Sequence, residues 1–243
     1  SGQFFSRIAF RAAGEGTLDI ETFSDDLDKK AARFELTWTL NRSDEKMPTV
    51  IAVSRFGHCL NDLLHRWKIG ALPIDIRAIV SNHEAMRPMA EFYGIPYHHV
   101  PVTRQTKMEA EAEFLNIVET SGAELVVLAR YMQILSDGLS AKWAGRCINI
   151  HHSFLPSFKG AKPYHQAFQR GVKLIGATAH YVTSDLDEGP IIEQDVERVD
   201  HSQTPDLLVE QGRDIEARVL SRAVKWHASR RVMMVGQRTI VLK

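Results

Sequence analysis

Residues able to do chemistry are concentrated in the segment Asn149-Ile150-His151-His152-Ser153-Phe154-Leu155-Pro156. It begins at the carboxyl end of a predicted buried strand, where open α/β sheets place their ligands. Asn149 and His151 are two positions apart, so on an extended backbone their side chains face the same side. The amide can stabilise a developing oxyanion, and the imidazole, which titrates near neutrality, can move a proton.

A second segment supplies carboxylates. It runs from Ala177 to Pro190, leaves a predicted strand and enters a loop with three acidic residues, among them Asp185 and Asp187. A carboxylate delivered to His151 would orient the imidazole, stabilise its charged form and hold a water molecule. The two segments together predict an Asn/His/Asp site for attack on a carbonyl. The plain alternative is a strand-end asparagine, a satisfied histidine and ordinary loop acids, and residue types alone leave it open.

A metal site is the rival interpretation, because four histidines lie in or near these segments: His151, His152, His165 and His180. The chain has no HExxH motif and no paired-cysteine spacing. Adjacent histidines on a strand also point to opposite faces and do not chelate together. We therefore expect no metal.

The elements that must hold these residues follow a regular order from residue 49 onward. Apolar strands are predicted at 50–53, 74–80, 97–100, 125–128 and 147–150, and helices at 57–67, 84–93, 107–120 and 137–143. Continuously apolar strands between helices indicate a mostly parallel sheet covered on both faces, hence a Rossmann-like α/β fold. Strands at 174–182 and 190–196, a helix from Thr204-Pro205 to Ser229 and a hairpin over 232–242 follow.

The first forty residues form a different pattern: a strand over Phe4–Phe10, a helix capped by Thr17, and a strand over Leu36–Leu40. A unit this small buries little core and must pair with the body or with another chain. We divide the chain into a small domain over 1–42, a linker over 43–48 that ends in proline, and a catalytic domain over 49–243.

Composition excludes several classes of protein. The 243 residues contain 30 lysines and arginines and 30 aspartates and glutamates. This balance argues against binding to nucleic acid or to an anionic membrane surface. Cys59 and Cys147 are not arranged as a pair, no apolar run approaches ~20 residues, and no signal segment opens the chain. We expect a cytoplasmic location.

The two chemistry-bearing segments resemble the formyltransferase superfamily that uses 10-formyltetrahydrofolate. Residues 149–156 match its N-x-H-x-S-x-L-P signature, and Asp187 follows His151 by 36 residues, as the family pattern requires. The runs over 151–182 and 185–196 resemble the deformylase branch nearly throughout. Residues 1–40 resemble the second half of an ACT domain, the small regulatory module of that branch. The strand, helix and strand expected before Phe4 are not part of this sequence.

The resemblance implies roles for individual residues. Asn149, His151 and Asp187 would be catalytic, and His180 would support them. Which one is the primary base stays open. The pterin would lie between two loops, with substrate contacts from Met132, Gln133, Ile134 and Leu135 in the first and from Val182, Thr183 and Asp185 in the second. On spacing alone, core packing is the simpler explanation for Met132, Ile134 and Leu135.

The acceptor of the formyl group depends on the loop over 54–62. A phosphorylated amine acceptor needs a loop of small residues whose N–H groups approach the phosphate, but here one glycine is flanked by Phe56 and His58. This favours water, and so hydrolysis to formate and tetrahydrofolate. Formyl transfer to an amine such as glycinamide ribonucleotide is the alternative, and a non-catalytic folate-binding regulator is a remote one. Neutral charge disfavours a tRNA-directed transferase.

The remaining expectations concern partners. Folate is the only small molecule that the resemblance implies besides an amino-acid effector at the ACT-like segment, and no further cofactor is expected. Unpaired strand edges in that segment predict a homo-oligomer. The resemblance implies a role in one-carbon metabolism, and whether that role is purine biosynthesis or one-carbon catabolism stays open.

Overall fold

The computed structural model describes residues 2–11, 18–156 and 163–243 of the chain. It divides into two compact units, Ser1–Glu45 and Lys46–Lys243, each described here by itself. None of the described helices is long and apolar enough to cross a membrane.

Among its described residues, the first unit contains one helix, α1 (Ile20–Arg33). Asp19 caps it by accepting hydrogen bonds from the N–H groups of Glu21 and Thr22, and the predicted cap, Thr17, lies outside the described residues. The strands predicted over Phe4–Phe10 and Leu36–Leu40 are wrong, because both segments are irregular. A strand is stable only when a neighbouring strand completes its hydrogen bonds, and the described part of this unit supplies none.

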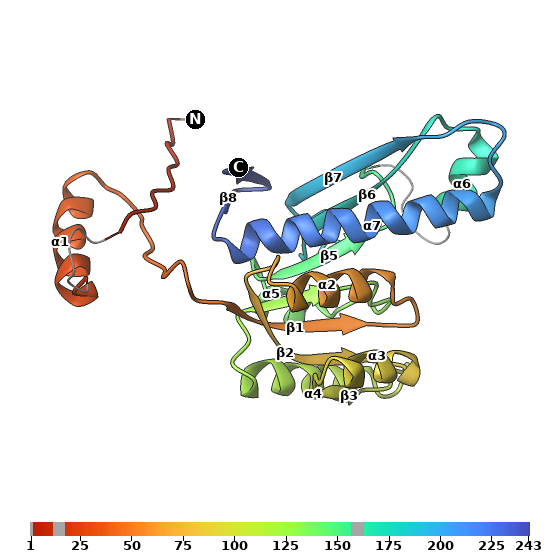
Figure 1. Cartoon of the computed structure of the whole chain (residues 1–243), viewed down its shortest axis with the longest axis horizontal. Helices are drawn as coiled ribbons and strands as arrows, with labels where there is room; N and C mark the ends of the chain where they lie inside the picture. Colours follow the sequence, from red (N-terminus) through yellow and green to blue (C-terminus); the bar gives the residue numbers. More distant parts are fainter. Residues whose placement is uncertain (1, 12–17, 157–162) are drawn as a thin grey trace. The chain divides into compact units, whose positions relative to one another are not determined.

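The second unit is built on a seven-stranded sheet in the order β3-β2-β1-β4-β5-β6-β7 (Figure 1). The strands are β1 (Met47–Val53), β2 (Ile74–Ser81), β3 (Tyr97–His99), β4 (Leu125–Leu128), β5 (Cys147–His151), β6 (Leu174–Tyr181) and β7 (Ile191–Arg198). β1 to β5 are parallel, and β6 and β7 join antiparallel. The predicted mostly parallel α/β sheet is confirmed.

Helices cover both faces of this sheet. They are α2 (His58–Lys68), the 3₁₀ turn η1 (Glu84–Met86), α3 (Arg87–Phe92), α4 (Lys107–Thr120), α5 (Asp137–Lys142), α6 (Pro163–Arg170) and α7 (Pro205–Ala228). Alternation along β1 separates two cores: Ile51 and Val53 pack with α2 and α7, whereas Val50 and Ala52 pack with α4. The sheet is therefore buried on both sides, as its apolar strands require.

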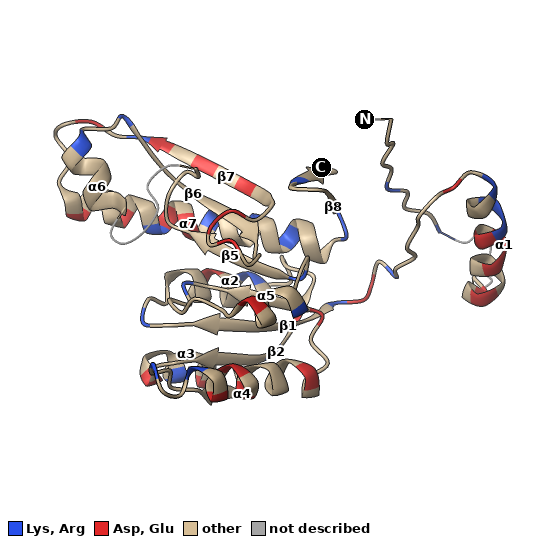
Figure 2. Cartoon of the chain, turned by 180° about the vertical axis from the view of Figure 1, so that it is seen from behind, with Lys and Arg blue, Asp and Glu red and all other residues tan. Residues whose placement is uncertain are grey.

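The carboxyl-terminal part agrees with prediction in most respects. Thr204 caps α7, its side chain accepting from the N–H of Leu207, and Pro205 opens the helix. The hairpin consists of β8 (Val232–Val235) and β9 (Arg238–Val241). Helix α6 was not predicted. Acidic Asp195 on β7 pairs with Arg218 and Arg222 of α7 at 2.9 and 3.1 Å. Figure 2 shows acidic residues along β7 and basic residues on α7.

The strand order places a topological switch point between β1 and β4. β1 is followed by β2 and then β3 on one side, and the chain then crosses to β4 on the other. The N–H of Ser54, just after β1, donates to the carbonyl of Arg130, just after β4, at 3.2 Å. The carboxyl ends of these strands are where an open α/β sheet binds ligands.

Candidate active site

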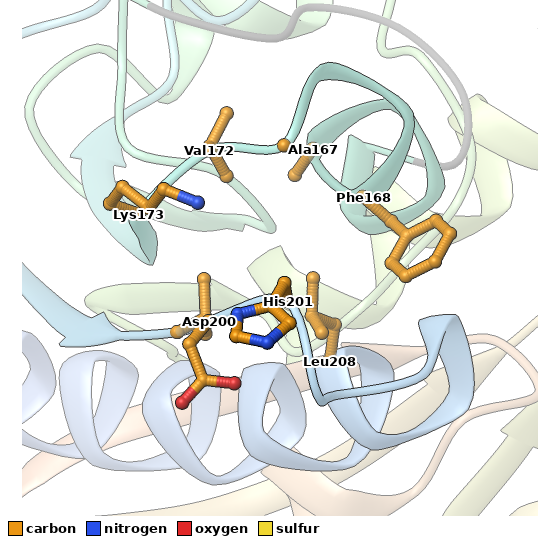
Figure 3. Close-up of a pocket in the computed structure, with 9 residues that line it drawn as sticks. Ala167, Phe168, Val172, Lys173, Asp200, His201 and Leu208 are labelled. Atoms are coloured by element: carbon orange, nitrogen blue, oxygen red, sulfur yellow. The ribbon is translucent and has the colours of Figure 1, made fainter.

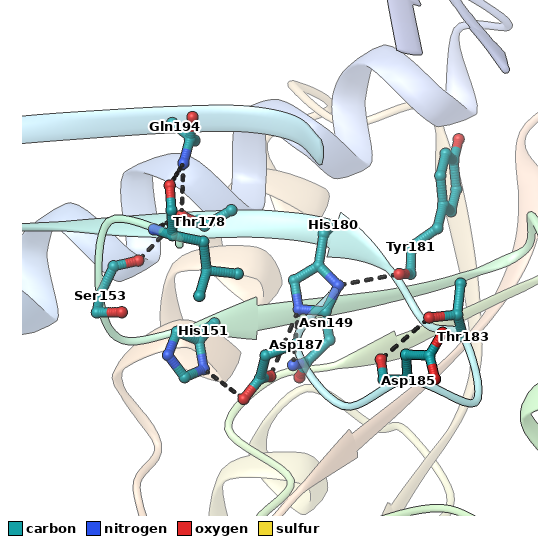
Figure 4. Close-up of polar contacts among 11 residues, drawn as sticks. Asn149, His151, Ser153, Thr178, His180, Tyr181, Thr183, Asp185, Asp187 and Gln194 are labelled. Carbon is teal, nitrogen blue, oxygen red and sulfur yellow. Dashed lines mark hydrogen bonds and ion pairs between the residues drawn. The ribbon is translucent and has the colours of Figure 1, made fainter. Parts of the chain in front are cut away.

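Asn149 and His151 occupy the carboxyl end of β5, and β6 lies antiparallel beside it. In this register His180 of β6 is opposite Asn149. The loop that leaves β6 returns over the strand end and brings Asp187 to the same place (Figure 4). The structure therefore brings together the three residues predicted as catalytic and the one predicted to support them.

Asp187 bridges the two histidines. Its Oδ2 lies 3.2 Å from Nδ1 of His151, and its Oδ1 lies 3.7 Å from Nε2 of His180. Asn149 Nδ2 lies 3.3 Å from the same Nε2 of His180. The Asp187 carboxylate thus orients His151 and His180, and His180 in turn contacts Asn149.

The charge of this group follows from its surroundings. Burial alone would raise the pKa of Asp187, but hydrogen bonds from His151 and then His180 outweigh burial and hold that pKa well below its usual range. Its side chain is 11% exposed and that of His151 is 5% exposed. Asp187 is therefore an ionised carboxylate in a largely dry site, where hydrogen bonds and ion pairs are strong.

The hydrogen bonds also fix which ring nitrogens are available. His180 Nδ1 lies 2.9 Å from the carbonyl of Tyr181, which only accepts, so this nitrogen carries the proton. His151 directs Nδ1 at Asp187, and its Nε2 is buried without a hydrogen-bond partner among the described residues. A buried nitrogen in this state is free to meet a water molecule or a substrate group.

The backbone of the loop is strained where the function requires it. Asp187 has a φ of 58°, in the left-handed region that costs a non-glycine residue roughly 1–2 kcal/mol. Two residues later, a Cβ on Gly189 would lie 1.7 Å from the carbonyl oxygen of Tyr181, so only glycine fits against β6. Such strain persists where the surroundings hold a residue in a required place.

The first predicted substrate loop is anchored at the switch point. Met132 donates its N–H to Ser54 Oγ at 2.9 Å. Met132 and Ile134 are 52% and 60% exposed, so core packing is the wrong explanation for them. Leu135 does pack against the core, and Gln133 is half-buried. Exposed apolar side chains on a loop at the carboxyl end of β4, the parallel neighbour of β5, are suited to holding a flat heterocycle.

The residues of the second predicted substrate loop, Val182, Thr183 and Asp185, have different environments. Val182 packs against the core and donates its N–H to the carbonyl of Cys147 at 2.9 Å, which ties the loop to β5. The Thr183 hydroxyl donates to the carbonyl of Asp185 at 3.1 Å. Asp185 itself is exposed, and the structure does not bring its carboxylate to the two histidines.

Thr178 is a supporting residue that the sequence did not reveal. Its hydroxyl accepts from the N–H of Leu155 at 3.0 Å and donates to the carbonyl of Ser153 at 2.9 Å. Gln194 Nε2 donates to the same hydroxyl at 2.9 Å, as Figure 4 shows. These bonds hold the segment that follows His151. The only signal was a polar residue within an apolar strand.

Comparison with known proteins assigns the family. The formyl transferase family model matches residues 47–224. The formyltetrahydrofolate deformylase of Corynebacterium sp. (strain P-1) is 52% identical over 244 residues, covering 100% of this chain and 85% of that protein. The chain belongs to the formyltetrahydrofolate deformylase family.

Solved structures of this deformylase family agree with the fold. The formyltetrahydrofolate deformylase of Burkholderia mallei has a TM-score of 0.89 and 55% identity, covering 93% of this chain and 80% of that one. Glycinamide ribonucleotide transformylase 1 of Symbiobacterium toebii is more distant, with a TM-score of 0.77 and 27% identity, covering 85% and 99%. The deformylase fold is thus shared with enzymes named for transfer to an amine.

This member of the deformylase family also has a buried polar cluster at the switch point, which sequence reasoning missed. Glu216 of α7 is 1% exposed; its Oε2 lies 2.8 Å from His58 Nε2, and its Oε1 accepts from the Tyr164 hydroxyl at 2.8 Å. Arg130 Nε lies 3.3 Å from the same Oε2. In the sequence, Glu216 is one charged residue within a predicted helix, and the helical pattern does not indicate that its side chain is buried.

The same cluster contains the one candidate metal-binding group in the described part of the chain. Ligand atoms of His58, Cys59 and Glu216 lie within 4.8 Å of one another. The Glu216 carboxylate is already engaged by an imidazole, a phenol and a guanidinium, and burial raises the pKa of the Cys59 thiol well above its usual value. A cation there would face the positive charge of Arg130, so the group fits an ion-pair network better than a metal centre.

A separate pocket lies between α6 and the amino-terminal end of α7 (Figure 3). Its walls are formed by Ala167, Phe168, Gly171, Val172, Lys173, Val199, Asp200, His201 and Leu208. It shares no lining residue with the site around His151.

Proposed function

We propose that this chain hydrolyses 10-formyltetrahydrofolate to formate and tetrahydrofolate. The observation that carries the proposal is the ion pair between Asp187 and Nδ1 of His151, which leaves the second nitrogen of His151 buried and without a hydrogen-bond partner among the described residues. Relatives that bear the deformylase name, with 52% identity in one case, support it.

Each residue has a distinct task in this reaction. His151 Nε2 takes a proton from water as the water oxygen bonds to the formyl carbon, and Asn149 donates an N–H to the resulting oxyanion. Asp187 orients His151 through Nδ1 and stabilises the imidazolium. The carbon–N10 bond then breaks as N10 receives the proton from His151, and the product leaves as formic acid, which loses its hydroxyl proton to water and becomes formate. His180 holds Asn149 and Asp187 from the neighbouring strand.

The substrate contacts are proposed on the two loops around this centre. Met132 and Ile134 present apolar side chains to solvent on the loop that follows β4, and Gln133 and Leu135 complete that loop. Val182, Thr183 and Asp185 lie on the loop that delivers Asp187. The pterin ring would bind between them, with no cofactor beyond the folate and no metal.

The setting of the enzyme is also a proposal. Cys59 and Cys147 are buried free thiols, which suits the reducing cytoplasm. The first unit carries an amphipathic helix and exposed apolar side chains such as Phe4 and Ile8. These features support a regulatory, ACT-like unit that assembles a homo-oligomer and responds to an amino acid. The physiological role would lie in one-carbon metabolism, with purine biosynthesis as one beneficiary.

Hydrolysis is tested by incubating the protein with 10-formyltetrahydrofolate alone and measuring formate and tetrahydrofolate. We expect the two products to appear in equal amounts with no added amine. Turnover that appears only with phosphoribosylglycinamide would establish the transferase instead. Absence of turnover under both conditions would favour the non-catalytic regulator.

A further inference from the structure

The loop that follows β4 is fixed near its start by a buried serine. The hydroxyl of Ser54, which is 2% exposed, accepts a hydrogen bond from the N–H of Met132 at 2.9 Å. The backbone N–H of Ser54 donates to the carbonyl of Arg130 at 3.2 Å. The other end of the loop is held by Glu111 of α4, whose carboxylate accepts from the N–H of Ser136 at 2.8 Å. The path of the loop is therefore set by residues outside it.

Between these anchor points the backbone of the loop is unpaired. The N–H and C=O groups of Gln133, Ile134 and Leu135 have no hydrogen-bond partner among the described residues. The loop leaves β4, in which Leu128 pairs with Asn149 of β5. Unpaired backbone groups beside a catalytic strand can bind the donors and acceptors of a heterocycle. The place where Ser54 holds the loop therefore sets where these groups meet a substrate.

The Ser54 hydroxyl connects this loop to the end of β2. Its Oγ donates to Oδ1 of Asn82, which follows β2 and is 8% exposed, at 2.7 Å. Asn82 Nδ2 lies 3.3 Å from Nε2 of His83. The Tyr97 hydroxyl of β3 donates to the carbonyl of His83 and so holds the backbone there. Met132, Ser54, Asn82 and His83 thus form one hydrogen-bond chain across the carboxyl ends of three strands.

The hydrogen bonds of this chain run in one direction. The N–H of Met132 can only donate, so the Ser54 hydroxyl accepts from it and gives its own proton to the amide oxygen of Asn82. The amide nitrogen of Asn82 is then directed at His83, and because this nitrogen only donates, Nε2 of His83 must accept. The chain is complete only while Nε2 carries no proton.

The surroundings of His83 keep its imidazole unprotonated at neutral pH. Burial, and then the charges of Arg55 after β1 and His99 of β3, hold the pKa of His83 below its ordinary value. The neighbouring acid, Glu84, lies 3.0 Å from His99 and 2.6 Å from Arg87. Its charge is engaged by these two partners, so it does not offset the cations around His83.

We propose that Ser54, Asn82 and His83 are positioning residues for folate: their hydrogen-bond chain places the unpaired groups of the loop after β4 where the substrate meets them, and a proton on His83 releases the loop. This inference rests on the proposed hydrolysis of 10-formyltetrahydrofolate and names residues that set the affinity for its substrate. A protonated Nε2 faces the Asn82 amide nitrogen donor to donor. The amide then turns, and the Ser54 hydroxyl loses its acceptor.

The first test is Ser54→Ala, which removes the acceptor for the N–H of Met132. We expect KM for 10-formyltetrahydrofolate to rise about five- to tenfold, the effect of one lost hydrogen bond, with kcat within about twofold of wild type because β5 and β6 hold the catalytic residues. Ser221→Ala is the matched control and should keep the wild-type KM, because Ser221 is 3% exposed and its hydroxyl donates to the carbonyl of Arg218 within α7. A folded Ser54→Ala variant with unchanged KM, or with kcat lowered as much as KM is raised, overturns the inference.

The second test follows the proton on His83 and does not depend on the folding of Ser54→Ala. Tetrahydrofolate, the product that carries the same pterin, is titrated by calorimetry at pH 7.5 and pH 5. His83→Gln keeps an acceptor for Asn82 but takes up no proton. We expect the acid-induced rise in the dissociation constant to be at least about threefold larger for wild type than for His83→Gln. His201→Gln, at an exposed histidine, should follow wild type.

The outcomes separate the two proposals. Equal acid dependence of tetrahydrofolate binding in wild type and His83→Gln overturns the positioning role of the chain. Absence of formate release by wild-type protein contradicts the proposed hydrolysis. An active wild type, combined with an unchanged KM in Ser54→Ala, contradicts only the positioning of the loop.

Discussion

At the scale of single residues, the candidate site depends on one ionised carboxylate shared by two histidines. Asp187 lies 3.2 Å from His151 and 3.7 Å from His180. In the proposed reaction Asp187 orients His151 through Nδ1, Nε2 takes the proton from water, and Asp187 acts through the imidazole without taking a proton itself. Removing its charge should therefore affect the reaction far more than the fold.

Asp187→Asn is expected to lower kcat for formate release by ~10²–10⁴-fold, the usual range for a group that supports proton transfer. Asparagine tolerates the left-handed φ of 58°, so the loop should keep its course. Steady-state kinetics and circular dichroism measure the two effects. Asp206→Asn, an exposed acid in the first turn of α7, is the matched control and should leave kcat unchanged. Near-normal turnover by Asp187→Asn would remove this residue from the mechanism.

The sequence could predict some of these residues and not others, for a physical reason. Asn149 and His151 are two apart on a strand end, and period-two alternation alone places them on one side. Their meeting with Asp187 followed from the family resemblance. Glu216 gave no such signal: helical periodicity cannot show that an acid is buried when its partners, His58 and Arg130, lie far away along the chain.

At the scale of elements, strands and helices with their own apolar pattern were predicted well. β4 and α4 have the predicted bounds, and α7 begins at its predicted cap. The elements that were predicted wrongly are those whose conformation depends on neighbouring segments of the chain. The segment over Phe4–Phe10 has strand-like composition but no described neighbour with which to pair. Residues 84–93 begin as a 3₁₀ turn and become α-helical only at Arg87, where Pro88 occupies the first turn.

The contact between α6 and α7 provides a prediction at this scale. Gly212→Ala is expected to destabilise the protein by roughly 1–3 kcal/mol, because the new methyl group clashes with Tyr164 and displaces its hydrogen bond to Glu216. Gly138→Ala in α5 makes the same change with open space around it, and should be neutral or stabilising. Urea unfolding of both variants gives the comparison. If the two substitutions changed the free energy of unfolding equally, the close approach of Tyr164 to Gly212 would not restrict the side chain at that position.

The contact between Tyr181 of β6 and His227 of α7 predicts that the folded protein loses stability in acid. Burial, and then the charge of Arg230, lower the pKa of His227 to about 4, and the Tyr181 hydroxyl lies 2.6 Å from its Nδ1. The unfolded chain binds a proton near pH 6.5 but the folded chain only near pH 4. Stability from this group is therefore complete above pH 6.5 and falls towards pH 4, by up to about 1.4 kcal/mol per pH unit.

The variant His227→Gln cannot take up this proton and retains an acceptor for Tyr181. The difference in unfolding free energy between pH 7 and pH 4.5, measured with urea, should be smaller in this variant than in wild type. His201→Gln, at an exposed histidine, should keep the wild-type difference. Parallel pH curves for wild type and His227→Gln would assign the acid sensitivity to other groups.

At the scale of the whole molecule, the two units contribute unequally to stability. Both hydrophobic cores draw their buried members from residues 47–228, whereas Ala31 is the one buried hydrophobic residue among those described in the first unit. Because apolar burial supplies most of the stabilising free energy, the second unit should fold by itself. All residues assigned to the catalytic centre also lie within it.

A chain restricted to residues 46–243 is therefore expected to unfold cooperatively within about 3 °C of the full chain and to release formate at a similar rate. The full chain should differ in what the first unit is proposed to supply: a larger assembly, and a response to an amino acid such as glycine or methionine. Calorimetry, light scattering and assays with each amino acid measure these properties on both chains. Insolubility of the shorter chain would mean that the first unit stabilises the second. An amino-acid response that persists without residues 1–45 would place the effector site in the catalytic unit.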